Sequence, residues 1–143
     1  MSAKPHERTA ERRIALQILY QGEILEVSPL ELVEKKLLVE EDALLGEYAK
    51  SLLEGCVDNV DAIDSYLMKA SENWALDRMP LVDRSLLRLA TYEMKYVKDV
   101  PVSVAINEAV NLAKEFGGAD SPRFVNGILG RIATQLEEES SNE

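Results

Sequence analysis

Apolar residues recur with the spacing of an α-helix along almost the whole chain, and this periodicity constrains the fold more than any other feature. The clearest series lies between Pro101 and Gly117. Its members are Val102, Ala105, Ile106, Ala109, Val110, Ala113 and Phe116. A series of this kind places one apolar stripe on a helix, and no segment shows the sustained alternation of a β-strand. We therefore predict an all-α protein.

Breaks in the periodicity divide the chain into about seven helices, which we expect to form two packed helical subdomains. The expected N-terminal half covers residues 8–70, and the expected C-terminal half covers residues 80–137. Residues 138–143 contain three glutamates and no basic residue, and they are predicted to form an acidic disordered tail. Residues 1–137 should therefore act as a single domain.

The last two helices carry the strongest local signals. Gly117 and Gly118 are expected to end one helix with a left-handed C-cap. The Ser121-Pro122 pair predicts the start of the next helix, with Ser121 as the N-cap. Gly127 and Gly130 lie inside that helix, where each glycine costs about 1 kcal/mol relative to alanine. A close helix–helix approach or a partner at the surface would explain both glycines.

Composition excludes several classes of protein. There is no apolar run of about 18 residues that could span a membrane, and the polar N-terminus does not resemble a secretory signal. Cys56 is the only cysteine, so an intrachain disulfide is excluded. These features predict a cytoplasmic protein that does not associate with membranes.

An enzymatic function is not expected. The chain has no Gly-rich phosphate loop. With Cys56 and His6 as the only residues of their types, it also cannot build a metal site from cysteines and histidines. The carboxylates Glu108 and Glu115 fall opposite the apolar stripe of their helix, which is typical of a solvated face. We therefore predict no catalytic residue, no cofactor and no metal.

The distribution of charge decides whether nucleic acid is a plausible ligand. The net charge is −10, which opposes binding to a phosphate backbone. The N-terminal segment is locally basic, with Lys4, Arg8, Arg12 and Arg13, although Glu7 and Glu11 interrupt it. A basic patch on an acidic body can bind RNA with strong dependence on salt, and a helix start that happens to carry arginines is the alternative.

The start of the last helix offers a second candidate surface. Phe124 lies about 110° from the centre of the core stripe, and Arg123 lies nearly opposite that centre. An aromatic ring and a guanidinium beside the positive end of a helix dipole suit a single-stranded nucleotide, because the ring stacks on a base and the cation meets phosphate. Phe124 as a peripheral core residue is the alternative.

Several ordered motifs complete the pattern. They are VPVSVAINEAVNLAK at residues 100–114, FVNGIL at 124–129, DRSLLRLATYE at 83–93 and ALQILY at 15–20. Together they resemble the bacterial transcription antitermination factor family NusB, over residues 8–133. The resemblance implies an all-helical, NusB-like fold of two helical bundles.

The resemblance also implies a function. NusB proteins bind the boxA element of ribosomal RNA leaders together with NusE, a small-subunit ribosomal protein. The heterodimer helps to load a termination-resistant complex on RNA polymerase in ribosomal RNA operons, with NusA and NusG. The family exists as monomers and as homodimers, and the sequence leaves both open.

Site residues follow from the resemblance position by position. It implies RNA contacts at Arg8, Arg12, Arg13, Asp120 and Phe124. Lys4, Ser121 and Arg123 join this RNA-binding set on the physical grounds given above. NusE contacts are implied at Tyr20, Asp77 and Asp83.

The chain departs from the family pattern at three positions. Thr9 and Ala10 stand where a basic residue can occur, and Ser71 stands where the family can carry an aromatic residue that contacts RNA. With the net charge, these departures favour weak RNA binding in the absence of NusE. A module that binds only a NusE-like protein is the second hypothesis. A helical fragment of a ribosomal RNA methyltransferase is the third, and the acidic end of the chain disfavours it.

Overall fold

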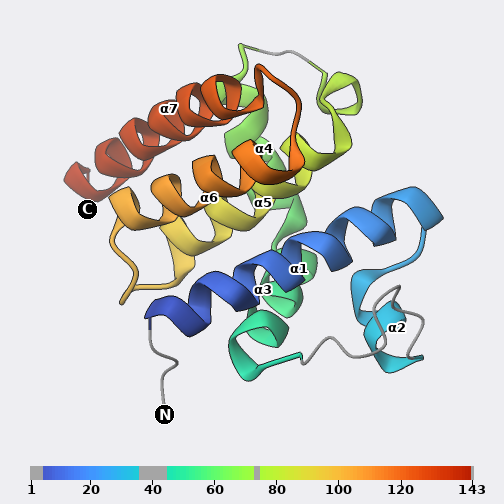
Figure 1. Ribbon diagram of the computed structural model, residues 1–143. Coiled ribbons are helices and arrows are strands. Elements are labelled where there is room, and N and C mark those ends of the chain that lie inside the picture. The colour runs from blue at the N-terminus through green and yellow to red at the C-terminus, as the bar shows by residue number, and fades with distance from the viewer. Residues whose placement is uncertain (1–4, 36–44, 73–74, 143) are drawn as a thin grey trace. The chain divides into compact units, whose positions relative to one another are not determined.

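The computed structural model describes residues 5–35, 45–72 and 75–142, and within these ranges it contains helices and no strands (Figure 1). The helices are α1 (Pro5–Leu25), α2 (Pro29–Glu34), α3 (Glu47–Asp58), α4 (Val60–Ala70), the short 3₁₀ helix η1 (Leu76–Arg78), α5 (Leu81–Tyr96), α6 (Val102–Phe116) and α7 (Ser121–Ser141). The predicted all-α fold with about seven helices is confirmed.

The chain forms two compact units, and the first one ends at Asp58. In this unit α1 packs on α2 and α3, and α2 also packs on α3. Ala15, Leu32, Leu52 and Leu53 are fully buried. Their spacing along the sequence puts them on the inner stripes of three amphipathic helices, so the hydrophobic effect is the main force that assembles this unit.

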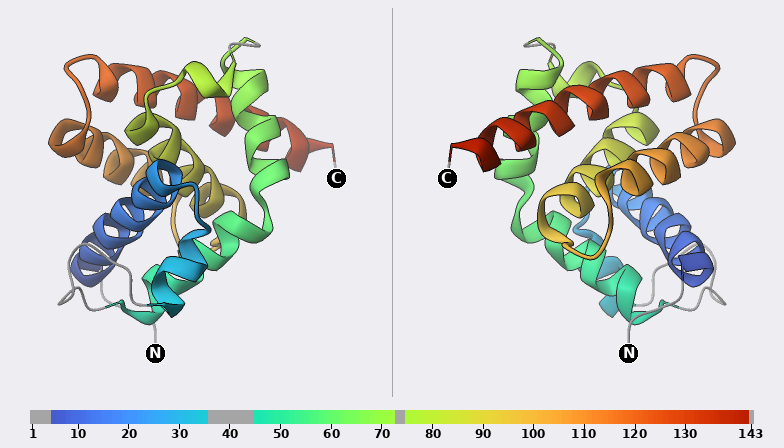
Figure 2. Two further views of the ribbon diagram at one scale, coloured as in Figure 1. Left: turned by 90° about the vertical axis from the view of Figure 1, so that its right-hand side faces the viewer. Right: turned by 90° about the vertical axis from the view of Figure 1, so that its left-hand side faces the viewer.

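The second unit contains α4 to α7. Helix α6 packs on both α5 and α7, while α4 packs on α5 and α7 (Figures 1 and 2). Leu67, Leu86, Leu129 and Ile132 are fully buried and come from α4, α5 and α7. From α6, the small residues Ala105, Ala109 and Ala113 and the larger Leu112 are buried, whereas Val102, expected in the core, is 36% exposed.

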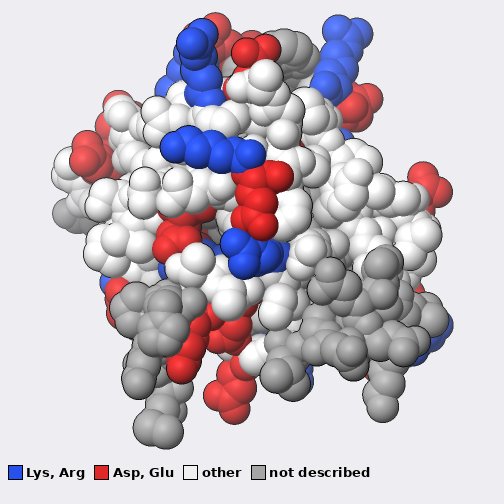
Figure 3. All heavy atoms as spheres, viewed as in Figure 1, with Lys and Arg blue, Asp and Glu red and all other residues white. Residues whose placement is uncertain are grey.

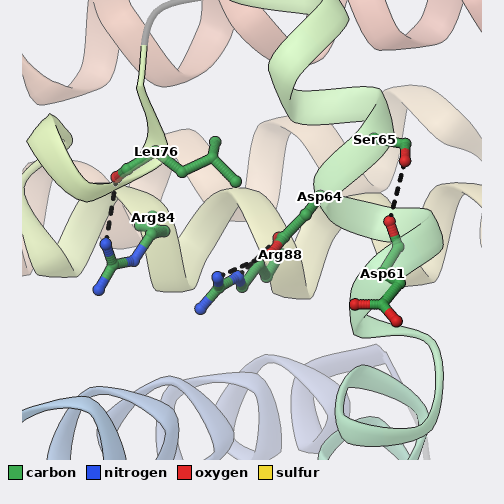
Figure 4. A network of polar contacts seen from close by, with 6 residues as sticks. All are labelled: Asp61, Asp64, Ser65, Leu76, Arg84 and Arg88. Atoms are coloured by element: carbon green, nitrogen blue, oxygen red, sulfur yellow. Dashed lines mark hydrogen bonds and ion pairs between the residues drawn. The ribbon is translucent and has the colours of Figure 1, made fainter.

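Helix α4 lies in the second unit, whereas the expected division had placed residues 59–70 in the N-terminal half. The contacts of α4 with α5 explain the difference. The Arg88 Nε and Nη2 donate to Asp64 Oδ1 and Oδ2, both at 2.9 Å, and join the two helices (Figure 4). Arg84 Nη1 also donates to the Leu76 carbonyl oxygen at 3.1 Å, which ties η1 to α5. The chain therefore divides at Asn59 rather than in the connector 71–80.

The turn between α6 and α7 differs from its predicted form. Gly117 has φ −94° and ψ −179°, and no glycine in the described ranges has a positive φ, so the expected left-handed C-cap is wrong. The N-cap of α7 is Asp120 and not Ser121. The physical reason is that the Ser121 Oγ faces back to the turn and accepts a hydrogen bond from the Gly118 N–H at 3.0 Å.

The acidic C-terminal segment is helical up to Ser141, so residues 138–141 are not the disordered tail that composition suggested. The hydroxyl of Tyr66 donates to both carboxylate oxygens of Glu139 at 2.7 and 2.6 Å, and Lys95 Nζ lies 3.3 Å from the same group. The hydrogen bond from Tyr66 lowers the pKa of Glu139. Contacts with α4 and α5 thus hold the last turns of α7, which charge repulsion alone would fray.

The two glycines inside α7 are exposed, and a Cβ added at either would meet no atom within 4 Å. A close helix–helix approach therefore does not explain them. Gly130→Ala is expected to raise the free energy of unfolding by about 1 kcal/mol, because alanine has the higher helix propensity. Urea denaturation followed by circular dichroism measures this change. A destabilised variant would contradict the open surroundings of Gly130.

Candidate functional site

The N-terminal arginines lie on α1 and differ in exposure. Arg8 is half-buried, with its guanidinium carbon 4.3 Å from the centroid of the Tyr48 ring. Arg12 is 5.7 Å from the same centroid and only 3% exposed. Arg13 is exposed, and Lys4 lies outside the described residues. Arg8 and Arg13 thus reach the surface, whereas the Arg12 side chain is buried, and the expected RNA contact of Arg12 stays a prediction.

Tyr48 is a member of this cluster that the sequence reasoning missed. It lies in the first turn of α3, and the guanidinium of Arg8 lies over its ring. A guanidinium over an aromatic ring is stabilised by the ring quadrupole and loses side-chain freedom. No periodicity signal identifies such a residue, because the pairing of Arg8 and Tyr48 depends on how α1 packs on α3.

Glu11 also has a role that the sequence did not reveal. Its Oε1 accepts hydrogen bonds from the backbone N–H groups of Tyr48 at 3.1 Å and Ala49 at 3.2 Å. The carboxylate therefore caps α3 from a neighbouring helix and meets the positive end of the helix dipole. A Cβ on Gly46 would lie 2.0 Å from this oxygen, so glycine keeps the space open. Glu11 is thus a structural cap and not only an interruption of the basic arm.

Glu11→Ala is expected to lower the free energy of unfolding by about 1 kcal/mol, because two N–H groups of α3 lose their acceptor. Urea denaturation measures the loss, and Glu54→Ala, at an exposed position on α3, is the control with a change within about 0.5 kcal/mol. If the two variants lost the same stability, the capping role of Glu11 would be refuted.

A second cluster lies where the turn 117–120 enters α7. Asp120 and Arg123 are exposed, and Phe124 is half-buried. The Ser121 N–H donates to the Gly118 carbonyl and the Phe124 N–H donates to the Asp120 carbonyl. Since Pro122 has no N–H, the start of α7 offers fewer backbone donors to an anion than a simple helix start. The exposed Arg123 side chain is therefore the main cationic group of this turn.

Asp83 and Ser121 are both buried in the second unit. Asp83 is 3% exposed and Ser121 is 5% exposed, and the Oδ1 of Asp83 has no hydrogen-bond partner in the described part of the chain. Burial raises the pKa of Asp83, and the Ser121 hydroxyl acts in the opposite direction. Both side chains are buried, and the expected partner contact of Asp83 and RNA contact of Ser121 stay predictions.

The other residues expected to bind a partner lie closer to the surface. Tyr20 is half-buried on α1, and Asp77 is exposed on η1. The structure places Tyr20 in the first unit and Asp77 in the second. Figure 3 shows basic and acidic side chains interspersed with neutral ones on the face it draws. The described side chains on this face do not form one continuous basic surface.

The described part of the chain contains no group of three or more His, Cys, Asp or Glu side chains arranged to hold a metal ion. Cys56 is buried in α3. None of the described helices is both long and apolar enough to cross a lipid bilayer.

Comparisons with known proteins match almost the whole chain. A family model for the NusB family matches residues 9–134. The transcription antitermination protein NusB of Kineococcus radiotolerans is 44% identical over 130 residues, which cover 91% of this chain and 95% of the relative.

Solved structures of NusB proteins are also similar to this chain. T. maritima NusB matches with a TM-score of 0.76 and 34% identity, over 94% of this chain and 93% of that one. A structure of the antitermination factors NusB and NusE in complex with dsRNA matches with a TM-score of 0.77 and 29% identity, over 92% of this chain and 99% of that one.

Proposed function

Because the chain belongs to the NusB family, we propose that it is an RNA-binding transcription antitermination adaptor. It binds boxA-type leader RNA together with NusE and helps to load a termination-resistant complex on RNA polymerase in ribosomal RNA operons. A structurally similar NusB forms a complex with NusE and dsRNA, which supports RNA and NusE as the proposed partners of this chain.

The observation that carries the proposal is the pairing of Phe124 and Arg123 at the start of α7. Phe124 is half-buried, so part of its side chain can be reached by a ligand, and the neighbouring Arg123 is exposed. A nucleotide base stacks on such a ring, while the guanidinium meets phosphate. Asp120 lies at the N-cap of the same helix and restricts where a phosphate approaches.

The arginines of α1 supply the second contact to RNA. Tyr48 places the Arg8 guanidinium, and the exposed Arg13 adds a second cation. Lys4 extends this basic segment. Phosphate contacts of this kind supply affinity and salt dependence rather than sequence specificity.

The proposal includes the wider assembly. The adaptor acts in the cytoplasm, has no catalytic function and works as one domain, with NusA and NusG among the components of the polymerase complex. Tyr20 in the first unit and Asp77 in the second each contribute a contact to NusE. A second candidate is a module that binds NusE and barely touches RNA, which the net charge of −10 and the burial of Arg12 favour.

Titration of a boxA-type RNA, with and without NusE and at two salt concentrations, separates the two candidates. Phe124→Ala is expected to weaken RNA binding about tenfold, because one stacking contact is lost. Phe124→Leu is the control, since leucine fills the apolar position but cannot stack. RNA affinity restored by leucine would assign Phe124 to the core, and NusE binding without any RNA binding would favour the protein-only module.

A further inference from the structure

Arg131 is an exposed cation on α7, in the same unit as Phe124 but outside the surface described so far. Its Nη1 donates to the carbonyl oxygen of Ala70, the last residue of α4, at 2.8 Å and lies 4.0 Å from Glu72 Oε1. Both contacts use one nitrogen of a group that carries five N–H donors, and the Arg131 side chain is 57% exposed. The guanidinium is therefore held in place at the end of α4 and is still reached by solvent.

Arg131 and Phe124 lie on the same side of α7. Seven residues separate them, which is close to two helical turns, so their directions from the helix axis differ by only about 20°. The rise of the helix puts them about 10 Å apart along its axis. Phe124 is half-buried, so part of its side chain can be reached. One side of α7 thus carries an aromatic ring and, two turns later, a guanidinium.

Gly127 lies between these two side chains, three residues after Phe124 and four residues before Arg131. It is exposed, and a Cβ added there would meet no described atom within 4 Å. Packing in the described part of the chain does not require this glycine, although it costs about 1 kcal/mol relative to alanine in a helix. The surface of α7 between the ring and the guanidinium is therefore open to a ligand.

The chemistry of this side of α7 indicates what kind of ligand fits it. A base of a single-stranded nucleic acid stacks on an aromatic ring, and a phosphate further along the strand pairs with a guanidinium. Glu138 is exposed and lies another seven residues after Arg131, on the same side of the helix. Its carboxylate repels phosphate, so a strand that follows this side of α7 has its last favourable contact at Arg131.

We propose that Arg131 is a further RNA-binding residue: RNA that stacks a base on Phe124 continues along α7 over Gly127, and one of its phosphates binds the Arg131 guanidinium. This inference rests on the proposed function, because it extends the surface that begins at Phe124. The competing explanation is that Arg131 only stabilises the end of α4 through the Ala70 carbonyl.

Salt-dependent titration of boxA-type RNA with the full-length chain and NusE tests Arg131. Arg131→Ala is expected to weaken RNA binding about fivefold at low salt. It is also expected to reduce the slope of log K against log salt by about 0.7, the counterion release of one phosphate in a single strand. Arg131→Lys keeps the charge and is expected to keep the wild-type slope. Lower stability of Arg131→Ala in urea with an unchanged salt slope overturns the proposal.

Gly127→Leu tests the path of the RNA independently of Arg131. Leucine has a higher helix propensity than glycine, so the variant is expected to fold, and its side chain fills the space that the strand would cross. RNA binding should therefore weaken. Gly130→Leu is the matched control, since Gly130 is exposed and equally open but points about 100° away from Arg131. Equal RNA affinity of the two leucine variants overturns the proposed path.

Phe124→Ala, measured in the same titration, separates failure of this inference from failure of the proposed function. RNA binding that weakens with Phe124→Ala but not with Arg131→Ala overturns only the inference. RNA binding that neither substitution weakens overturns both the inference and the RNA surface proposed at the start of α7.

Discussion

Gly117→Ala is expected to lower the free energy of unfolding by about 2–3 kcal/mol, because the new methyl group has no room and a buried hydrogen bond is disturbed. The added Cβ would lie 2.5 Å from the Ser121 Cβ and 2.9 Å from the Ala113 carbonyl oxygen. These neighbours are a short side chain and a backbone atom, which cannot rotate away as a long side chain does. The turn has to shift, and Ser121 then leaves its buried position.

Urea denaturation followed by circular dichroism measures this loss, and Gly118→Ala is a matched control one residue away. A Cβ at Gly118 would meet only the Ser121 Oγ, at 4.0 Å. Its φ is not positive, so alanine is not strained there. We expect this control to change stability by no more than about 0.5 kcal/mol. Equal effects of the two substitutions would contradict the close packing of Gly117 against Ser121.

Removal of the ion pair between Asp64 and Arg88 is expected to cause the second large loss of stability. Asp64→Ala is expected to destabilise the protein by about 2 kcal/mol, since it leaves the guanidinium partly buried without its bidentate acceptor. The side chains of Arg88 and Asp64 are only 18% and 23% exposed, so solvent screens this pair less than it screens a surface ion pair. Arg88→Lys is not expected to substitute, because an ammonium cannot make both hydrogen bonds in the plane of the carboxylate.

A double-mutant cycle with Asp64→Ala and Arg88→Ala isolates this pair from the other contacts of Arg88. We expect a coupling energy of about 1–2 kcal/mol from denaturation curves. The exposed pair Glu31 and Lys35 on α2 is the comparison, with an expected coupling below about 0.5 kcal/mol. Similar coupling in the two pairs would show that the junction of α4 and α5 does not depend on Asp64 and Arg88.

The helical character of the chain and its family could be predicted from the sequence. The apolar spacing in residues 102–116 is a local feature, and local geometry is what helical periodicity reports. The exposed Arg123 and half-buried Phe124 at the start of α7 were also predictable, because a helical wheel places each side chain relative to the core stripe.

The polar contacts between helices depend on tertiary packing. Glu11 and Tyr48 are far apart in sequence, as are Tyr66 and Glu139, and no periodicity relates them. A charged residue on one helix looks the same in sequence whether it faces solvent or caps a neighbouring helix. Packing made Glu11 a cap, buried Arg12 and Asp83, and attached Glu139 to Tyr66, because each outcome depends on which helix lies against which.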